Sequence, residues 1–216
     1  MKTIALLFLS TTLAFAGCKK TANNSDRGVA APTTSSKTPK PKPAPPADGD
    51  RVEVLARHLP AAGQADLDSD PVVVHFARFD VTKASFDPKN LEHGTATLEL
   101  DVASLKTGSD ERDDDLKSRE FLDVARFATV TIAVGNVKKQ ADTRYTADAT
   151  VACHGVSKTY AVTFEVLATT ADTVRIKGEH AFSRLDFAIG IDPAKDPTER
   201  IDTALIIQWV VTLKTS

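Results

Sequence analysis

Hydrophobic and polar residues alternate along most of the chain after residue 70, and this pattern constrains the fold more than any other feature. Within residues 95–104, for example, Ala96, Leu98, Leu100 and Val102 occupy every second position. Successive side chains of a β-strand point to opposite faces of its sheet, so a period of two predicts a strand with one buried face. Further segments with this period are residues 72–81, 129–134, 145–153, 160–166, 174–176 and 205–213.

Turn-forming residues separate these segments, at residues 87–90, 135–136, 141–142, 155 and 192–193. Strands at short spacing, with turns between them and no long amphipathic helix, predict an antiparallel sandwich or barrel. A parallel α/β architecture is excluded, because each parallel connection needs a long crossover, usually a helix. The chain also lacks the G-x-G-x-x-G, P-loop and G-x-S-x-G motifs of nucleotide-binding proteins and hydrolases.

Residues 109–123 interrupt the alternation with a charged run that gains Leu116, Phe121 and Leu122 toward its end. Acidic residues are favourable at a helix N-terminus, so we predict a short helix over about residues 114–121 that caps one end of the sheet. The aspartates within residues 110–115 do not follow the D-x-[DN]-x-[DN]-G spacing of a calcium loop. This favours a solvated acidic segment.

The N-terminus has the features of a bacterial lipoprotein signal peptide over residues 1–17. Lys2 supplies a positive charge, an apolar stretch runs from Ile4 to Phe15, and small residues come directly before Cys18. We expect this segment to be removed and Cys18 to be lipidated with acyl chains such as palmitate, which would anchor the protein to a membrane. The alternative is an ordinary secretory signal with an incidental cysteine.

Residues 18–50 form the expected tether between the lipidated cysteine and the folded domain. The segment is rich in proline and its single branched aliphatic residue is Val29. Such a composition buries too little apolar surface to offset the entropy of ordering, so we expect disorder. No other stretch reaches the roughly 18 apolar residues of a membrane span. The expected location is the bacterial cell envelope, lipid-anchored and facing the periplasm, with the outer membrane as the preferred site.

Charge and cysteine usage exclude several function classes. Residues 51–216 carry 20 Lys and Arg against 26 Asp and Glu, which argues against nucleic-acid binding. With Cys18 lipidated, Cys153 has no cysteine partner, and the histidines are scattered, so no metal site is expected. Nothing in the sequence places a nucleophile beside a base, so we expect no catalytic residues and no enzymatic activity.

Three motifs, taken together, resemble the YceI-like, polyisoprenoid-binding family. The first lies within residues 103–127 and comprises ASLKTG, Arg112-Asp113 and EFLDVARF; the second is CHGVSK at 153–158, and the third is SRLDF at 183–187. Their order and spacing agree with the family over about residues 71–214. The resemblance implies an all-β, eight-stranded antiparallel lipocalin-like barrel over residues 51–216, with a short helical segment and an apolar cavity for an isoprenoid chain.

Candidate ligand-binding residues follow from this resemblance in two groups. Polar residues expected at the cavity mouth are Arg112, Asp113, His154 and Arg184. Residues expected to line the interior are Phe79, Phe86, Leu98, Leu100, Val102, Phe164 and Trp209. Alternatively, Arg112–Asp113 and Arg184–Asp186 are structural ion pairs, and the lining residues fill a packed barrel.

The favoured hypothesis is a membrane-tethered periplasmic protein that binds or carries an isoprenoid such as a quinone or a prenyl phosphate. Such a protein needs no cofactor beyond the bound isoprenoid lipid. Its expected partners are that lipid and the membrane, and homodimer formation is a further possibility. The alternative is a structural or adaptor lipoprotein with a packed barrel that recruits a protein partner. An eight-stranded barrel allows either, because its interior is just wide enough for side chains or for one slender ligand.

Overall fold

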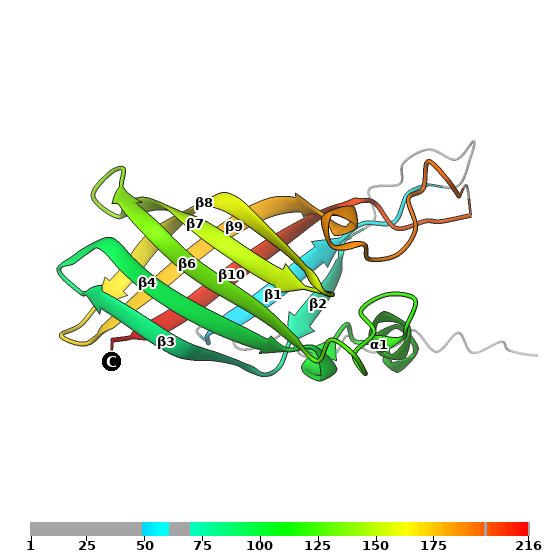
Figure 1. Ribbon diagram of the computed structural model, residues 1–216, viewed down its shortest axis with the longest axis horizontal. Helices are drawn as coiled ribbons and strands as arrows, with labels where there is room; N and C mark the ends of the chain where they lie inside the picture. Colours follow the sequence, from blue (N-terminus) through cyan, green and yellow to red (C-terminus); the bar gives the residue numbers. More distant parts are fainter. Residues whose placement is uncertain (1–48, 61–69, 197, 216) are drawn as a thin grey trace, which may run out of the picture. The chain divides into compact units, whose positions relative to one another are not determined.

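One antiparallel sheet of ten strands dominates the computed structural model, which describes residues 49–60, 70–196 and 198–215 (Figure 1). The predicted signal peptide, Cys18 and residues 19–48 of the tether lie outside the described residues. The strands are β1 (Arg51–Ala56), β2 (Val72–Phe76), β3 (Phe79–Asp87), β4 (Asn90–Asp101), β5 (Leu105–Lys106), β6 (Thr129–Lys139), β7 (Arg144–Cys153), β8 (Val156–Thr169), β9 (Thr173–Ser183) and β10 (Ala204–Lys214). The helices are α1 (Asp110–Lys117) and two 3₁₀ turns, η1 (Val102–Ser104) and η2 (Arg184–Phe187).

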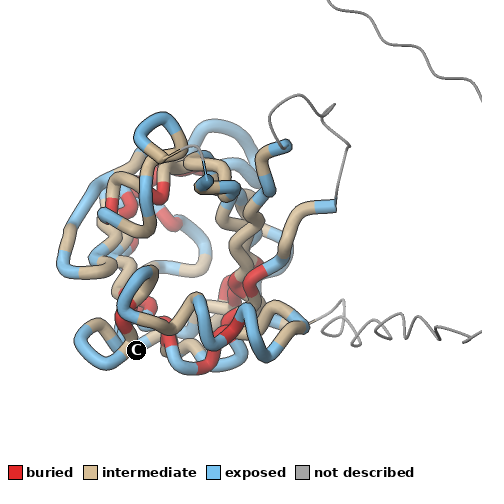
Figure 2. Tube along the Cα trace, turned by 90° about the vertical axis from the view of Figure 1, so that its right-hand side faces the viewer, coloured by how far each residue is buried: buried red, intermediate tan, exposed pale blue. Residues whose placement is uncertain are grey.

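The sheet curls around a central axis, as the end-on view in Figure 2 shows. Its strand order is β3-β4-β6-β7-β8-β9-β10-β1-β2-β5, so most neighbours in the sequence are also neighbours in the sheet. The first strand of that order, β3, approaches β10 where the Thr215 hydroxyl donates a hydrogen bond to the Phe86 carbonyl, 3.2 Å away. The carboxylate of Asp50 accepts hydrogen bonds from the Thr212 amide and hydroxyl, which ties the residue before β1 to β10.

The predicted all-β antiparallel barrel is confirmed, but the predicted number of eight strands is wrong. The additional pieces are short. The two-residue strand β5 pairs with the end of β2, and residues 72–81, predicted as one strand, are divided into β2 and β3. The division occurs because the backbone turns around the buried Ser104: the amide of Ala77 donates to its carbonyl and that of Arg78 to its hydroxyl oxygen.

The predicted helix exists, but it begins and ends four residues earlier than expected, at Asp110 and Lys117. Ser109 caps it, because its hydroxyl oxygen accepts a hydrogen bond from the Arg112 amide. Three acidic residues therefore occupy the first turn itself, where they complement the positive end of the helix dipole. Figure 1 shows α1 at one end of the sheet, as predicted.

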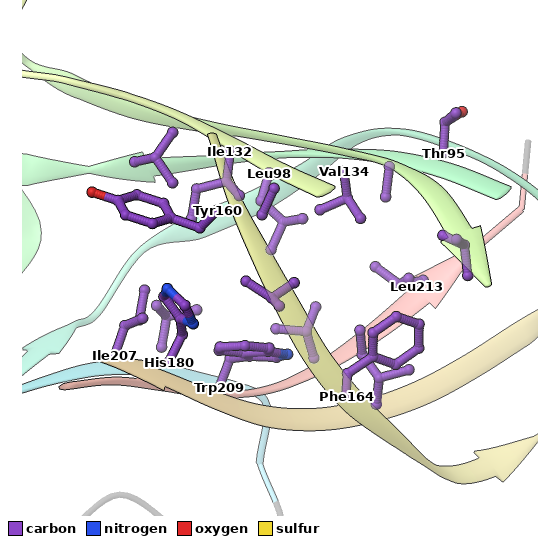
Figure 3. Close-up of a pocket in the computed structure, with 18 of the residues that line it drawn as sticks. Thr95, Leu98, Ile132, Val134, Tyr160, Phe164, His180, Ile207, Trp209 and Leu213 are labelled. Carbon is purple, nitrogen blue, oxygen red and sulfur yellow. The ribbon is translucent and has the colours of Figure 1, made fainter. Parts of the chain in front are cut away.

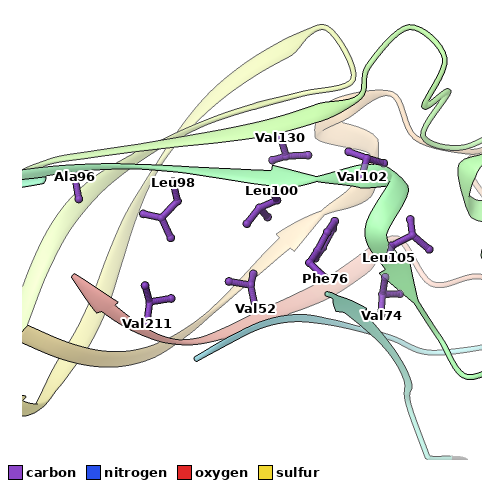
Figure 4. Packing of buried hydrophobic residues seen from close by; sticks show 10 residues of the cluster. All are labelled: Val52, Val74, Phe76, Ala96, Leu98, Leu100, Val102, Leu105, Val130 and Val211. Carbon is purple, nitrogen blue, oxygen red and sulfur yellow. The ribbon is translucent and has the colours of Figure 1, made fainter. Parts of the chain in front are cut away.

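The inward residues of the strands form two apolar clusters, one toward each end of the barrel. The first, shown in Figure 4, gathers Leu100, Val102, Leu105, Val52 and neighbouring side chains beside the end that carries α1. The second lies around Tyr145, whose ring stacks on that of Phe164 with centroids 5.5 Å apart. The inward side chains of these clusters leave two cavities inside the barrel.

Candidate functional site

An apolar cavity of about 150 Å³ lies inside the barrel, beside the second cluster. Among the described residues its lining contains no Asp, Glu, Lys or Arg, and its polar side chains are Thr95, Tyr160, His180 and Trp209. Figure 3 shows Tyr160, His180 and Trp209 inside the barrel, whereas Thr95 at its edge points outward. The first cavity is therefore almost entirely hydrophobic.

A second, larger cavity of about 420 Å³ extends toward the end covered by α1. Its inner wall is apolar and includes Leu100, Val102 and Cys153. Its rim is polar, with Arg112 on α1 and Arg57 and His58 directly after β1. The volume falls within the range of about 300–1,000 Å³ that is usual for ligand pockets.

The two cavities adjoin each other along the barrel. Five residues, Ile132, Val151, Phe182, Phe187 and Ile207, line both. Strand β10 runs along the full length, because its inward residues line the second cavity at Leu205 and the first at Leu213. Eight residues of extended strand span about 26 Å, so the two adjoining cavities, together called the tunnel, follow the barrel over about that length.

Six of the seven residues predicted to line the interior do so. Phe86, Leu98, Phe164 and Trp209 line the first cavity, and Leu100 and Val102 line the second. Phe79 lines neither. It is the first residue of β3, opposite Leu100, and packs against the apolar cluster at the α1 end.

Arg112 lies at the rim of the second cavity, where its exposed side chain faces the opening from α1. The alternative ion pair with Asp113 does not form. The buried carboxylate of Asp113 instead accepts hydrogen bonds from the amide and hydroxyl of Thr107, at 2.7 and 2.8 Å, and lies 3.0 Å from the Lys106 ammonium.

Asp113 therefore lines neither cavity and secures the loop before α1 instead. Burial alone would raise the pKa of its carboxyl group, but the hydrogen bonds from Lys106 and Thr107 outweigh burial and lower the pKa. The carboxylate is thus held ionised beneath the helix, and its role is to position α1 over the end of the tunnel.

Arg184 lines the second cavity, yet its guanidinium is occupied by backbone carbonyls. The side chain is 2% exposed and donates to the carbonyl oxygens of Asp202, Ile189, Ile191 and Ile201 at 2.7–3.0 Å. The alternative pairing with Asp186 does not form: the Arg184 Nη2 atom lies 3.8 Å from the Glu199 carboxylate instead, and Asp186 accepts a hydrogen bond from the Tyr160 hydroxyl. Arg184 thus clamps the two ends of the segment between η2 and β10.

Gly190 allows the clamp to close. Its φ of +67° lies in the left-handed region, and a Cβ atom there would come within 2.5 Å of the Arg184 Nη1 atom. The clamped segment, residues 188–203, contributes Ile189 and Ile201 to the wall of the second cavity. One arginine therefore shapes one side of the tunnel opening.

His154 lies at the turn between β7 and β8 and lines neither cavity. Its Nδ1 atom is 3.0 Å from the Phe187 carbonyl oxygen, and its ring meets that of Phe127 edge-on, with centroids 4.8 Å apart. These contacts hold η2 against the β7–β8 turn.

Sequence inspection missed Tyr160 and His180 as lining residues. Both occupy the inward phase of their strands, β8 and β9, so the alternation itself could have identified them. Burial, followed by the hydrogen bond to Asp186, raises the pKa of Tyr160 to about 12. The hydroxyl therefore stays protonated, with its proton directed to Asp186.

Cys153 lies in the wall of the second cavity as a free thiol, and burial raises its pKa to about 11. The described part of the chain contains no group of three or more His, Cys, Asp or Glu side chains arranged to hold a metal ion. Within that same part, no helix is long and apolar enough to span a bilayer.

Relatives of known sequence match parts of the chain. A protein named YceI from Salmonella arizonae is 39% identical over 67 residues, which cover 31% of this chain and 35% of the relative. A UPF0312 protein from Vibrio cholerae serotype O1 is 25% identical over 97 residues, or 45% of this chain and 51% of the relative. The chain spans about half the length, or less, of these curated relatives.

Solved structures share the fold over most of their length. BcnA from Burkholderia cenocepacia superposes with a TM-score of 0.64 at 20% identity, covering 76% of this chain and 96% of BcnA. A polyisoprenoid binding domain from Saccharophagus degradans, implicated in plant cell wall breakdown, gives 0.60 at 14% identity, covering 77% and 94%. A model of the YceI-like domain matches residues 51–213, so the match begins at β1, before the part covered by the three motifs. The chain belongs to the YceI-like domain family.

Proposed function

We propose that this protein binds an isoprenoid lipid within the barrel and carries it at a membrane surface. The observation that carries the proposal is the elongated, largely apolar interior formed by the two adjoining cavities. A slender hydrocarbon chain fits such a space, whereas a packed barrel would leave no room for it. The tunnel therefore favours a lipid carrier over an adaptor with a filled interior.

The proposed contacts divide along the tunnel. Leu98, Phe164 and Trp209 in the first cavity, and Leu100 and Val102 in the second, would contact the chain. Arg112 at the rim would contact the polar part of the lipid during entry or exit. Asp113, His154 and Arg184 would act indirectly, because each positions a segment beside the opening. The fold that this chain shares with a structure described as a polyisoprenoid binding domain supports the same class of ligand.

The cellular setting rests on the N-terminal sequence. The lipidation expected at Cys18 would hold the barrel in the bacterial envelope, facing the periplasm, with the tether of residues 18–50 giving it reach from the outer membrane. Several acyl chains on one cysteine give lasting attachment, whereas a single chain binds only marginally. No catalytic step and no nucleic-acid partner form part of the proposal, and a homodimer is not required for it.

Transfer from the bilayer into the tunnel would be close to neutral in free energy, because lipid tails already provide an apolar environment. Exchange between membrane and protein would therefore be reversible, as a carrier needs. Selectivity would depend on the shape of the tunnel and on its few polar groups.

Native mass spectrometry of the full chain purified from membranes tests the proposal. A co-bound lipid is expected, and extraction should identify an isoprenoid. Ala149→Phe would place a ring in the first cavity and should reduce the bound fraction, whereas Ala161→Phe adds the same ring at an exposed position of β8 and should not. Circular dichroism confirms folding of both variants. Repeated purification of empty wild-type protein would overturn the proposal.

A further inference from the structure

Three aliphatic side chains form a row on the outside of the barrel, which we call the outer row. Val73 on β2 and Ile206 on β10 are 40% and 38% exposed, and Leu55 on β1 is paired with both. Neighbouring strands of a sheet lie about 4.8 Å apart, so the three side chains are side by side. A single exposed aliphatic side chain is normal on a protein surface, whereas a contiguous group of them points to an interaction surface.

The outer row covers the wall of the second cavity from outside. Each member has two neighbours in the sequence that line this cavity: residues 72 and 74 beside Val73, 54 and 56 beside Leu55, and 205 and 207 beside Ile206. Successive side chains of a strand point to opposite faces, so the outer row points away from the cavity at the same level.

Polar side chains bound the outer row on the side away from the rim. The next outward residues of the three strands are His75, Glu53 and Gln208, which are paired in turn across β2, β1 and β10. The Nδ1 atom of His75 lies 3.8 Å from the Glu53 carboxylate, and the Gln208 amide donates to the Glu179 carboxylate at 3.1 Å. The apolar surface is therefore confined to the ends of β1 and β10 that adjoin the rim.

A further aliphatic side chain is exposed at the same rim. Ile191, which is 54% exposed, belongs to the segment clamped by Arg184. The Arg184 Nη2 atom donates to the carbonyl oxygens of both Ile191 and Ile201, and Ile201 is bridged to His58 directly after β1. Figure 1 shows this segment and the end of β1 at one end of the barrel. Among the described residues, three of the four exposed large hydrophobic side chains thus lie at this end, and the fourth, Leu167, lies near the far end of β8.

The size of this surface and the start of the folded domain favour a lipid bilayer as its partner over a second copy of the chain. A stable protein interface buries about 800 Å² on each partner, and a few half-exposed aliphatic side chains offer far less. Residues 19–50 separate the expected anchor, Cys18, from β1, and a flexible chain of about 30 residues spans about 30 Å. Leu55 lies only about 17 Å along the strand from Asp50, so the anchor can hold the outer row at the same membrane.

We propose that the outer row and Ile191 dock on the lipid bilayer and turn the opening of the second cavity toward the membrane. This inference rests on the proposed function and adds the orientation in which the carrier meets its lipid. The aliphatic side chains pass from water into the outer part of the bilayer, and a lipid can then exchange between bilayer and barrel without crossing water. His75, Glu53 and Gln208 stay in the headgroup layer and limit the depth of insertion.

Fluorescence of the full lipidated chain in vesicles tests this orientation. The vesicles consist of phosphatidylethanolamine and phosphatidylglycerol, with or without a nitroxide-labelled lipid that quenches a nearby dye. Ala204→Cys places the dye on the same outward phase of β10 as Ile206, and Ala168→Cys places it near the far end of β8. Burial raises the pKa of the native Cys153 thiol to about 11, so it labels slowly, and the wild type measures that background. Quenching is expected at residue 204 and not at residue 168.

Variants in the labelled Ala204→Cys chain test the residues. Ile206→Gln and Ile191→Gln each replace an exposed aliphatic side chain with a neutral polar one, and Leu167→Gln is the matched control at the far end. Each methylene group that enters a bilayer contributes about fourfold to partition, so one or two groups per side chain contribute about 4- to 15-fold. Ile206→Gln and Ile191→Gln should each lower the ratio of docked to undocked chain by about that factor, and Leu167→Gln should leave it unchanged. Circular dichroism checks folding.

The other outcomes overturn the inference. Equal quenching at residues 204 and 168, or unchanged quenching in Ile206→Gln and Ile191→Gln, would show that the outer row does not face the bilayer. Shielding of the dye without vesicles that rises with protein concentration would assign the row to a second copy of the chain. A chain that does not float with the vesicles would refute the anchor and the docking together. Lipid binding is decided separately by native mass spectrometry, so a docked chain that is always empty would refute the carrier, and a loaded chain without docking would refute only the orientation.

Discussion

Replacement of Arg184 by methionine should open the segment between η2 and β10. The guanidinium donates four hydrogen bonds to carbonyl oxygens of residues 189, 191, 201 and 202, at 2.7–3.0 Å, from a side chain that is 2% exposed. Hydrogen bonds to charged groups contribute about 1.5–3 kcal/mol each, but bonds from one group are not additive. Removal of one partner from a buried network typically costs about 3–5 kcal/mol, and we expect about 4 kcal/mol here.

The loss should appear in two measurements. For a domain of this size about 4 kcal/mol corresponds to a decrease in Tm of roughly 8–16 °C by circular dichroism. Trypsin should also cut faster after Lys195 and Arg200, which lie in the clamped segment. Arg184→Lys keeps the charge but has no planar fork, so it should fall between the wild type and Arg184→Met.

The exposed Arg119→Met serves as the matched control, and it should change stability by less than about 0.5 kcal/mol. A loss below about 1 kcal/mol in Arg184→Met, together with unchanged cleavage at Lys195 and Arg200, would show that the four carbonyls do not depend on this side chain.

Three further changes have expected outcomes. Gly178→Ala forces a methyl group against Trp209, which should lower the free energy of unfolding by about 1–3 kcal/mol and shift the fluorescence emission of the single tryptophan. Gly135→Ala is the control and should cost less, because nothing lies within 4 Å of a Cβ atom there. Equal losses of stability in the two variants would contradict the close approach of Gly178 and Trp209. Because the folded pKa of Asp113 lies below its ordinary value of about 3.9, its contribution to stability is present above that pH and is lost as pH falls through the folded value. Asp113→Asn should therefore lose less stability than the wild type in acid denaturation between about pH 5 and pH 2, and parallel curves would refute this. Because burial raises the pKa of Cys153 to about 11, its thiol should react with iodoacetamide at pH 8 about two orders of magnitude more slowly in the folded protein than in the unfolded chain. Peptide mapping measures both rates. Similar rates in the two states would show that the thiol is accessible.

Much of the barrel could be predicted from alternation alone. The alternating segments at residues 95–101, 145–153 and 205–213 correspond to strands, because a sheet with one buried face imposes a period of two on the side chains, whereas residues 102–104 of the first predicted segment form η1. Six cavity-lining residues were predicted from the family resemblance, and alternation applied to the rest of β9 would also have identified His180. The boundaries were less accurate. The helix begins at Asp110 because the Ser109 side chain caps it with a local hydrogen bond. The prediction relied on the pattern of acidic residues, which does not show where the cap lies.

The polar residues were harder to assign, because charge and order in the sequence do not specify partners. Asp113 is adjacent to Arg112 in the sequence but is bound by Lys106 and Thr107 in the structure. Arg184 is two residues from Asp186, yet its guanidinium reaches carbonyls up to 18 residues away. In both cases the side chain does not pair with the opposite charge nearest in the sequence. It binds groups that the fold brings together in a buried site, where every donor requires an acceptor.

Local periodicity determined which faces of the strands turn inward, and with that the class of fold and most of the tunnel wall. It acts between neighbouring residues, so the sequence carries it directly. Whether the inward side chains would meet across the barrel or leave a tunnel depends on the curvature of the sheet, and only the tertiary structure decided it. The same holds for the carbonyl partners of Arg184, since they come from residues 189–202 and reach the guanidinium only when the segment folds back over it.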